Sequence, residues 1–149
     1  MKKSILAILL AVVMVASLLP FGALADEPEF EEWSSTTSLP TKSGYYKLTN
    51  DVAVSSEATI GSYSTTVPEV PGVSVVLDLN GHTITADASV YYIQKTGGLT
   101  IIDSSNEKTG KITNSENIDV FAALIDVSGY FELDGGTIEN TSSFGYGIS

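Results

Sequence analysis

Two aspartates are the side chains of this sequence best suited to acid–base chemistry. Asp78 and Asp134 fall at corresponding positions of two similar passages, LDLNG at residues 77–81 and LDGG at residues 133–136. Two carboxyl groups on one face of a protein can hydrolyse a glycosidic bond, one as acid and one as base or nucleophile. Aspartates beside turns also accept hydrogen bonds from backbone N–H groups. The sequence favours this structural interpretation of both residues.

The same carboxylates are candidate calcium ligands. Asp78, Asp103 and Asp134 all lie near expected turns, and calcium binds six to eight oxygen atoms. The sequence contains no loop with a fixed calcium-binding spacing. Asp78 and Asp134 are therefore kept only as the alternative metal site, and we expect neither a metal nor another cofactor.

Other catalytic chemistry is narrowly limited. The chain has no cysteine and no arginine, and His82 is its one histidine. The lack of cysteine excludes zinc–thiolate sites, cysteine nucleophiles and a lipid-modified cysteine. We expect His82 to make a structural hydrogen bond at a turn, since no nucleophile or carboxylate partner is evident. No catalytic residue is predicted.

Three pairs of adjacent aromatic residues carry more information, at positions 45–46, 91–92 and 130–131. Successive residues of a strand point to opposite faces, so one ring of each pair faces outward in either register. Outward tyrosines can stack on a sugar ring, pack on a protein partner, or stack on one another. The candidate ligand-binding residues are Tyr46, Tyr92 and Tyr130.

Strands must position these side chains, and the sequence predicts strands from residue 44 onward. In residues 73–80 apolar and other side chains alternate, which predicts one inward face and an outward Asp78. Residues 55–72 are polar, contain Pro68 and Pro71, and predict a protruding loop. No amphipathic helix of useful length follows residue 25.

A turn followed by an isoleucine recurs along the chain. Gly81, Gly110 and Gly136 precede Ile84, Ile112 and Ile138, at intervals of about 26 to 29 residues. Degenerate repeats of this length are typical of solenoids, in which each unit buries its apolar face against a neighbour.

Two of the repeats can be superposed if residues 102–108 are an insertion at a corner. The matched pairs are Ile93 with Ile125, Gly97 with Gly129, Leu99 with Phe131, and Ile101 with Leu133. We therefore predict an all-β fold of about four stacked parallel coils. Asn-Gly and Asp-Gly turns also fit antiparallel hairpins, so a β-sandwich is the alternative.

The first 25 residues predict a signal peptide. Lys2 and Lys3 precede an apolar run at residues 5–19, and cleavage is expected between Ala25 and Asp26. The run is short for a transmembrane helix, which needs about 20 apolar residues. An uncleaved amino-terminal anchor is the alternative.

Residues 26–43 form an acidic leader and amino-terminal cap in this interpretation, and residues 44–149 form the coils. A solenoid has an unpaired end that needs covering, which Phe30, Trp33 and Leu39 could supply. An unstructured acidic tail is the alternative for residues 26–32.

The chain is acidic, with a formal net charge of −11. Removal of the signal peptide would make it more negative, because two lysines and no acid would be lost. This charge disfavours nucleic acid, anionic membrane surfaces, and acidic polysaccharides that lack a bridging cation.

Three passages carry a resemblance to a known family. Residues 77–85 (LDLNGHTIT) and 131–138 (FELDGGTI) resemble coils of the pectin-lyase-like superfamily, and more narrowly the repetitive surface proteins of Gram-positive gut bacteria. Residues 39–49, with Leu39-Pro40 and SGYYKLT, resemble the amino-terminal strand of those proteins. The resemblance implies a right-handed parallel β-helix with three short sheets.

The chain also departs from this family. Lyases of the superfamily use an arginine base and calcium, and this sequence has no arginine. Relatives are commonly longer and carry an anchor, whereas residues 145–149 look like the opening of another coil. The expectation is an incomplete last coil and a fragment of a longer protein.

The functional expectation is a secreted or cell-surface bacterial protein without catalysis of its own. It would act as an adhesin-like or structural binding module, with glycans or another surface protein as partners and membrane contact only during export. The alternative is an amino-terminal fragment of a polysaccharide lyase or glycoside hydrolase.

Overall fold

The computed structural model describes residues 27–87, 89–115, 123–142 and 146–149. The regular structure in these ranges consists of β-strands. The predicted signal peptide and its cleavage site, Ala25 and Asp26, lie outside the described residues.

The described strands form three sheets. The first sheet has the order β1 (Glu31–Trp33), β2 (Gly44–Leu48), β5 (Val73–Asp78), β8 (Gly97–Ile102) and β11 (Tyr130–Asp134). The second has the order β12 (Thr137–Glu139), β9 (Lys111–Asn114), β6 (Thr83–Ala86) and β3 (Val52–Val54). The third has the order β10 (Ile125–Val127), β7 (Tyr91–Ile93) and β4 (Ala58–Ile60).

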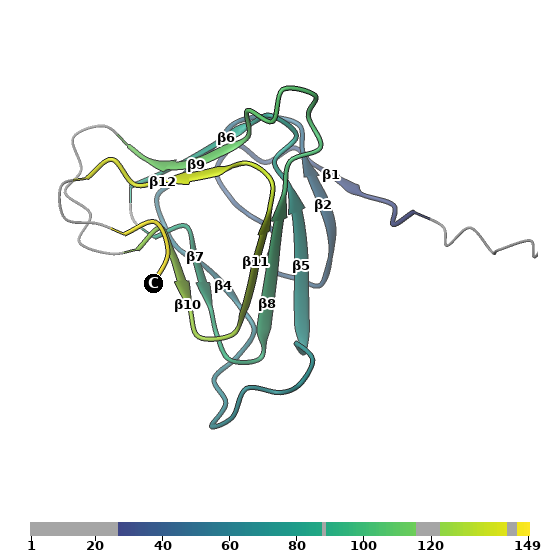
Figure 1. Cartoon of the computed structure of the whole chain (residues 1–149), viewed down its shortest axis with the longest axis vertical. Coiled ribbons are helices and arrows are strands. Elements are labelled where there is room, and N and C mark those ends of the chain that lie inside the picture. Colours follow the sequence, from purple (N-terminus) through teal and green to yellow (C-terminus); the bar gives the residue numbers. More distant parts are fainter. Residues whose placement is uncertain (1–26, 88, 116–122, 143–145) are drawn as a thin grey trace, which may run out of the picture.

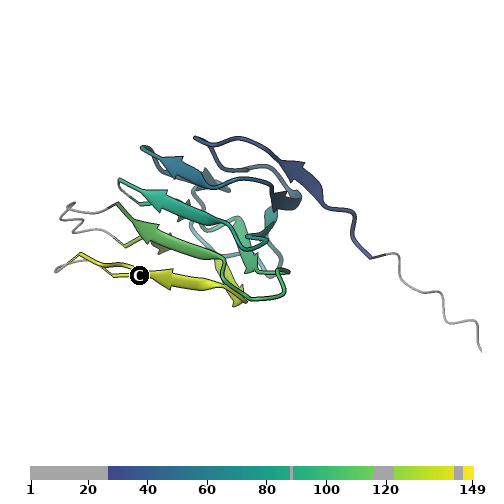
Figure 2. The ribbon, with the colours of Figure 1, turned by 90° about the horizontal axis from the view of Figure 1, so that it is seen from above.

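From β2 onward the chain visits the first, second and third sheets in turn and then begins again. We call one such passage a circuit. The sheets form the sides of a roughly triangular outline (Figure 1), and successive circuits lie one beside the next in sequence order (Figure 2). All pairings between the described strands are parallel. The antiparallel hairpins on which the β-sandwich alternative rested are therefore not found among them.

The core consists of inward side chains that repeat at the same register position in neighbouring strands. In the second sheet one such row is Val52, Ile84, Ile112 and Ile138. The predicted recurrence of isoleucines is thus confirmed as a spatial row. Val52, Ile84 and Ile112 are almost fully buried, and burial of each such side chain contributes roughly 1.5–3 kcal/mol.

The predicted superposition of two repeats is confirmed in the first sheet and wrong in the third. Leu99 pairs with Phe131 and Ile101 with Leu133, as expected. Ile93, however, pairs with Val127 and not with Ile125. The corner before β11 is two residues shorter in register than the corner before β8. Aligning Gly97 with Gly129 and counting back an equal number of residues therefore matched Ile93 with Ile125, two positions away from its true partner Val127.

Gly129 makes that short corner possible. A Cβ atom at this position would lie 2.3 Å from the carbonyl oxygen of Gln94 and 2.4 Å from that of Gly97. Real Cβ contacts do not reach such distances, so two circuits can approach this closely only at a glycine.

The prediction of one long loop at residues 55–72 is wrong in its first part, because β4 lies within it. Ala58 pairs with Tyr91, and Ile60 pairs with Ile93 and is fully buried. One inward isoleucine among serines and threonines gives too weak an alternation to predict a strand from sequence. The strand is stabilised by its pairing with β7, which the sequence pattern does not reveal. The loop proper follows β4, and its Tyr63 is 81% exposed.

Asn80 and Gly81 form the predicted corner between the first and second sheets. Both have positive φ angles, 49° and 81°, and the N–H of His82 donates to the carbonyl of Leu79 at 2.8 Å. Asparagine and glycine are the residues that tolerate this backbone region. The next corner spans residues 103–110, between β8 and β9, whereas only residues 135–136 separate β11 from β12. The predicted insertion is thus confirmed, except that Ile102, its first predicted residue, belongs to β8 and pairs with Asp134.

Residues 31–40 lie across one end of the stacked circuits. β1 pairs with β2, and the N–H of Ala53 donates to the carbonyl of Thr36 at 2.8 Å. Trp33 packs edge-to-face on Tyr46 with 5.5 Å between ring centroids, and the Tyr91 hydroxyl donates to the carbonyl of Pro40 at 3.1 Å. These contacts cover the strand edges and the core at this end.

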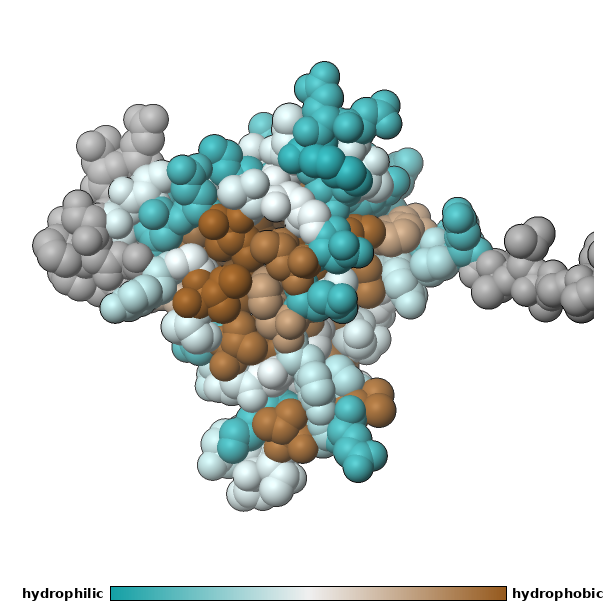
Figure 3. Space-filling view, viewed as in Figure 1, coloured by the Kyte–Doolittle hydropathy of each residue, from teal (hydrophilic) through white to brown (hydrophobic). Residues whose placement is uncertain are grey.

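The opposite end presents apolar side chains to the surface, visible as the brown centre of Figure 3. Leu133 is 41% exposed and Ile148 44% exposed, while Phe131 and Ile138 are partly buried against the core. Ile148 forms a parallel bridge with Ile125, so residues 146–149 extend the third sheet by one strand position. The last members of the inward rows are thus exposed or only partly buried at this end.

This difference between the two ends leads to a stability prediction. Leu77 and Leu133 occupy the same inward row, but Leu77 is fully buried between two strands. Leu77→Ala should lower the free energy of unfolding by about 2–5 kcal/mol, and Leu133→Ala by less than about 1 kcal/mol. Urea denaturation of both variants measures this difference. Equal losses would contradict a core organised by these rows.

Candidate functional site

Asp78 lies in the outward row with Lys47 and caps a turn, as the favoured interpretation predicted, but it is covered and not exposed. Its side chain is 1% exposed, and Oδ1 accepts hydrogen bonds from the N–H groups of Asn80 at 2.9 Å and Ser104 at 2.8 Å. The ammonium of Lys47, on the neighbouring strand, lies 3.3 Å from Oδ2. Burial is possible because these donors and the lysine replace the water that a carboxylate needs. Asp78 therefore stabilises a corner.

Asp134 does not share a site with Asp78. It is exposed on β11, and Ile102 of β8 occupies the register position between the two aspartates. Among the described residues, no group of three or more potential metal ligands comes together. The structure thus does not join Asp78 and Asp134 into one site.

Asp103 is the centre of a second corner network. It is 2% exposed and accepts hydrogen bonds from the N–H groups of Gly81 at 2.9 Å, Ser105 at 3.1 Å and Gly110 at 2.7 Å. Burial alone would raise the pKa of Asp103. The adjacent Ser105 hydroxyl and the three N–H donors outweigh burial and hold this pKa below its ordinary value. Its carbonyl also accepts from Lys108. This carboxylate organises the inserted corner.

Asp103→Asn tests this role. An amide would turn an N–H₂ group towards one of the donors, so we expect a loss of about 1–3 kcal/mol near neutral pH. The native pKa is lowered, so the carboxylate stabilises the fold above its unfolded pKa of about 3.9 and loses this contribution as the pH falls through the native value. The gap between wild type and variant should therefore narrow in acid.

Urea denaturation across that pH range measures the gap. Glu107→Gln, an exposed change in the same corner, serves as the control. A gap that stays constant with pH would show that the charge of Asp103 is not what matters.

His82 lies at a turn in a structural contact, as predicted, but it has a carboxylate neighbour that the sequence analysis did not identify. Its Nδ1 lies 3.2 Å from Oδ1 of Asp51, and the same oxygen accepts a hydrogen bond from the N–H of Thr83 at 2.9 Å. Both contacts tie the corner after β5 to the preceding circuit.

The three candidate tyrosines lie in different environments. Tyr46 is 7% exposed and points inward, so its neighbour Tyr45, 44% exposed, is the outward ring of that pair. The choice of Tyr46 as an outward ligand-binding ring was therefore wrong. Strand alternation fixes that one ring of a pair faces out but not which one.

Tyr92 is half-buried on the outer face of the third sheet, between Thr59 and Asp126 in register. The pKa of Glu57 is raised, mainly by partial burial and to a smaller extent by the negative charge of Asp126. A hydrogen bond with Ser89 acts in the opposite direction but is weaker. Tyr92 thus lies on an acidic part of the surface.

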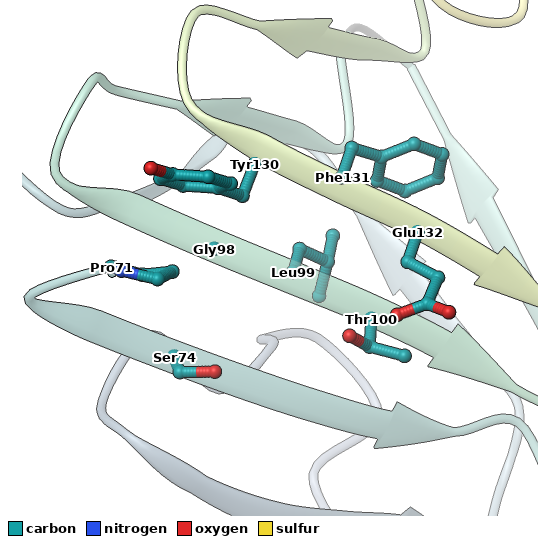
Figure 4. Close-up of a pocket in the computed structure, with 8 residues that line it drawn as sticks. All are labelled: Pro71, Ser74, Gly98, Leu99, Thr100, Tyr130, Phe131 and Glu132. Carbon is teal, nitrogen blue, oxygen red and sulfur yellow. The ribbon is translucent and has the colours of Figure 1, made fainter. Parts of the chain in front are cut away.

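Tyr130 lies in a groove on the outer face of the first sheet (Figure 4). The groove has a volume of about 260 Å³. Its lining residues come from β5, β8, β11 and the loop before β5: Pro71, Ser74, Gly98, Leu99, Thr100, Tyr130, Phe131 and Glu132. This size is slightly below that of pockets for drug-sized ligands and suits one small ring.

The register explains the shape of the groove. Ser74, Gly98 and Tyr130 form one outward row across three strands. Gly98 has no side chain, so the Tyr130 ring lies over open backbone (Figure 4). A Cβ atom at Gly98 would lie 2.8 Å from Cγ of Pro71. The absence of a side chain at Gly98 therefore leaves the space between Pro71 and Tyr130 open. Leu99 and Phe131 belong to the next, inward row.

Polar groups flank the aromatic ring on the same face. Thr100 and Glu132 are register partners in the next outward row, and the Glu132 carboxylate points towards Thr100 (Figure 4). An aromatic face beside hydroxyl and carboxylate groups is suited to a ligand that has both C–H faces and hydroxyl groups.

A second groove, of about 360 Å³, lies at the covered end. It is lined by Glu31, Trp33, Leu39, Pro40, Thr41, Lys42 and Tyr46. Its two rings pack on each other, and the Trp33 indole N–H donates to the carbonyl of Ser38 at 2.8 Å. We assign these side chains to closing the core.

Sequence reasoning selected Tyr130 but missed the other groove residues. The match of Leu99 with Phe131 already placed Gly98 beside Tyr130. A glycine in register with an outward aromatic residue was therefore the signal for a groove.

Comparison of the chain with family models, curated proteins and solved structures finds no match in any of the three. In the part of the chain that the structure describes, no helix is long and apolar enough to cross a membrane.

Proposed function

We propose that this chain is a right-handed parallel β-helix that acts outside the bacterial cell as a non-catalytic, adhesin-like binding module for glycans. Three parallel sheets visited in cyclic order support the solenoid. Connections between parallel strands of one sheet are nearly always right-handed. Kinship to pectin-lyase-like surface proteins is part of the proposal and rests on residues 77–85 and 131–138.

The location outside the cell rests on the sequence of residues 1–25, which has the features of an export signal. A fold without cysteine, held by a stacked core, suits an exported protein that needs no disulfide. A rigid stack of short sheets also presents its outer face at little entropic cost on binding.

The observation that carries the glycan proposal is the Tyr130 groove. Its ring lies over Gly98 with hydroxyl groups and a carboxylate beside it. A pyranose could place its C–H face on the ring while its hydroxyl groups bond to Ser74, Thr100 and Glu132.

The non-catalytic part of the proposal rests on the corner acids. Asp78 is engaged by Lys47 and two N–H groups, and Asp103 by three N–H groups. Carboxylates fixed in this way hold the fold and are not positioned beside the groove to act as a pair.

Tyr130→Ala tests the site. We expect it to weaken binding to the best ligand of a glycan array at least tenfold, because aromatic stacking is lost. Titration calorimetry measures the affinity. Tyr63→Ala removes another exposed ring, outside the groove, and should leave the affinity unchanged.

Two results would count against the proposal. If Tyr130→Ala and wild type bind the array equally, the groove is not the glycan site. If incubation with a bound polysaccharide releases unsaturated or new reducing ends, the protein is an enzyme.

A further inference from the structure

The lining of the Tyr130 groove is unbalanced in charge. Glu132 is the one charged residue in the lining. The lysines of the described residues, all outside that lining, are Lys42, Lys47, Lys95, Lys108 and Lys111.

Four of these lysines have contacts that hold them elsewhere. Lys47 pairs with Asp78 at 3.3 Å and Lys111 with Glu139 at 3.2 Å. Lys108 donates to the carbonyl of Asp103, and Lys95 donates to that of Thr65 at 3.5 Å. A negatively charged sugar in the groove would therefore meet Glu132 with no cation in the lining to balance either charge.

Glu132 is close to any ring stacked on Tyr130. The two residues are two positions apart on β11, so both point outward and their Cα atoms are separated by about 6.6 Å. Figure 4 shows both side chains on the face that carries Ser74 and Thr100. A substituent at the edge of a ring stacked on Tyr130 is thus within reach of the carboxylate.

We infer that the groove prefers glycans with free, unacetylated amino groups, which are positively charged. This inference rests on the proposed glycan binding at Tyr130. A ring ammonium would donate charge-assisted hydrogen bonds to Glu132 and would lie beside the electron-rich face of Tyr130.

The charge of the whole chain acts in the same direction. A net charge of −11 attracts a cationic polymer over a longer range than the groove itself and raises the rate of encounter. Such general attraction is screened by salt, whereas a contact made inside the groove is screened less. Selectivity that survives at physiological salt therefore belongs to the site.

Three oligosaccharides test the inference: the positively charged hexamer of glucosamine, the neutral hexamer of N-acetylglucosamine, which differs from it by the acetyl groups, and the negatively charged hexamer of galacturonic acid. Calorimetry at about pH 5.5 and about 0.15 M salt should give an affinity about tenfold higher for the glucosamine hexamer than for the N-acetylglucosamine hexamer. The galacturonic acid hexamer should not bind measurably.

Glu132→Gln is the decisive variant. It keeps the size of the side chain and an oxygen that can accept from sugar hydroxyl groups, but it removes the charge. The ratio of the affinities for the glucosamine and N-acetylglucosamine hexamers should therefore fall from about tenfold to less than about twofold. Glu107→Gln removes the same charge from an exposed corner and should preserve the preference within twofold.

Several outcomes would overturn the inference. They are equal binding of the two hexosamine oligomers to wild type, a preference that survives Glu132→Gln, loss of the preference in Glu107→Gln, and competition by hexalysine as strong as that by the glucosamine hexamer. Failure of the proposed function itself looks different: none of the three hexamers binds, and Tyr130→Ala changes nothing.

Discussion

The rest of the structure depends on inward rows of aliphatic side chains that repeat in register from strand to strand, such as Val52, Ile84, Ile112 and Ile138. Each strand is too short to be stable alone, so its stability comes from the strands on either side and from the apolar row inside. This arrangement fixes which residues face outward. The Tyr130 groove exists because the inward positions of Leu99 and Phe131 force Gly98 and Tyr130 to the outer face.

The corners reduce the stability of this fold unless their backbone groups find other partners. The chain turns there, so backbone N–H groups have no partner in a neighbouring strand. Buried Asp78 and Asp103 satisfy several of these groups across successive circuits. The amide of Asn80 adds a bond to the carbonyl of Leu48 at 3.0 Å. The carboxylates that look most reactive in the sequence thus hold circuits together, and the proposed binding site lies apart from them on the outer face of the first sheet.

The proposed site is a groove that is open to solvent on the outer face of a sheet, so it can take one ring of a longer glycan. The same openness limits the contact to a few side chains, and the contribution of a single exposed carboxylate to affinity is modest. Selectivity at such a site is therefore a matter of charge sign and ring stacking more than of shape.

The spacing of glycines and isoleucines was sufficient to predict parallel stacked strands and the Leu99–Phe131 register, because a repeat of apolar positions directly reflects the contacts that neighbouring circuits make. The same pattern of strands predicted one outward ring in the pair at residues 130–131, without showing which. It could not predict β4, whose stability comes from pairing with β7, or the pairing of Ile93 with Val127, which depends on how tightly the Gly129 corner turns. Only the tertiary structure decided that Asp78 is buried while Tyr45 is exposed and Tyr46 is not. Alternation along one strand gives two equivalent faces, and only packing against neighbouring strands and corners selects the face that is covered.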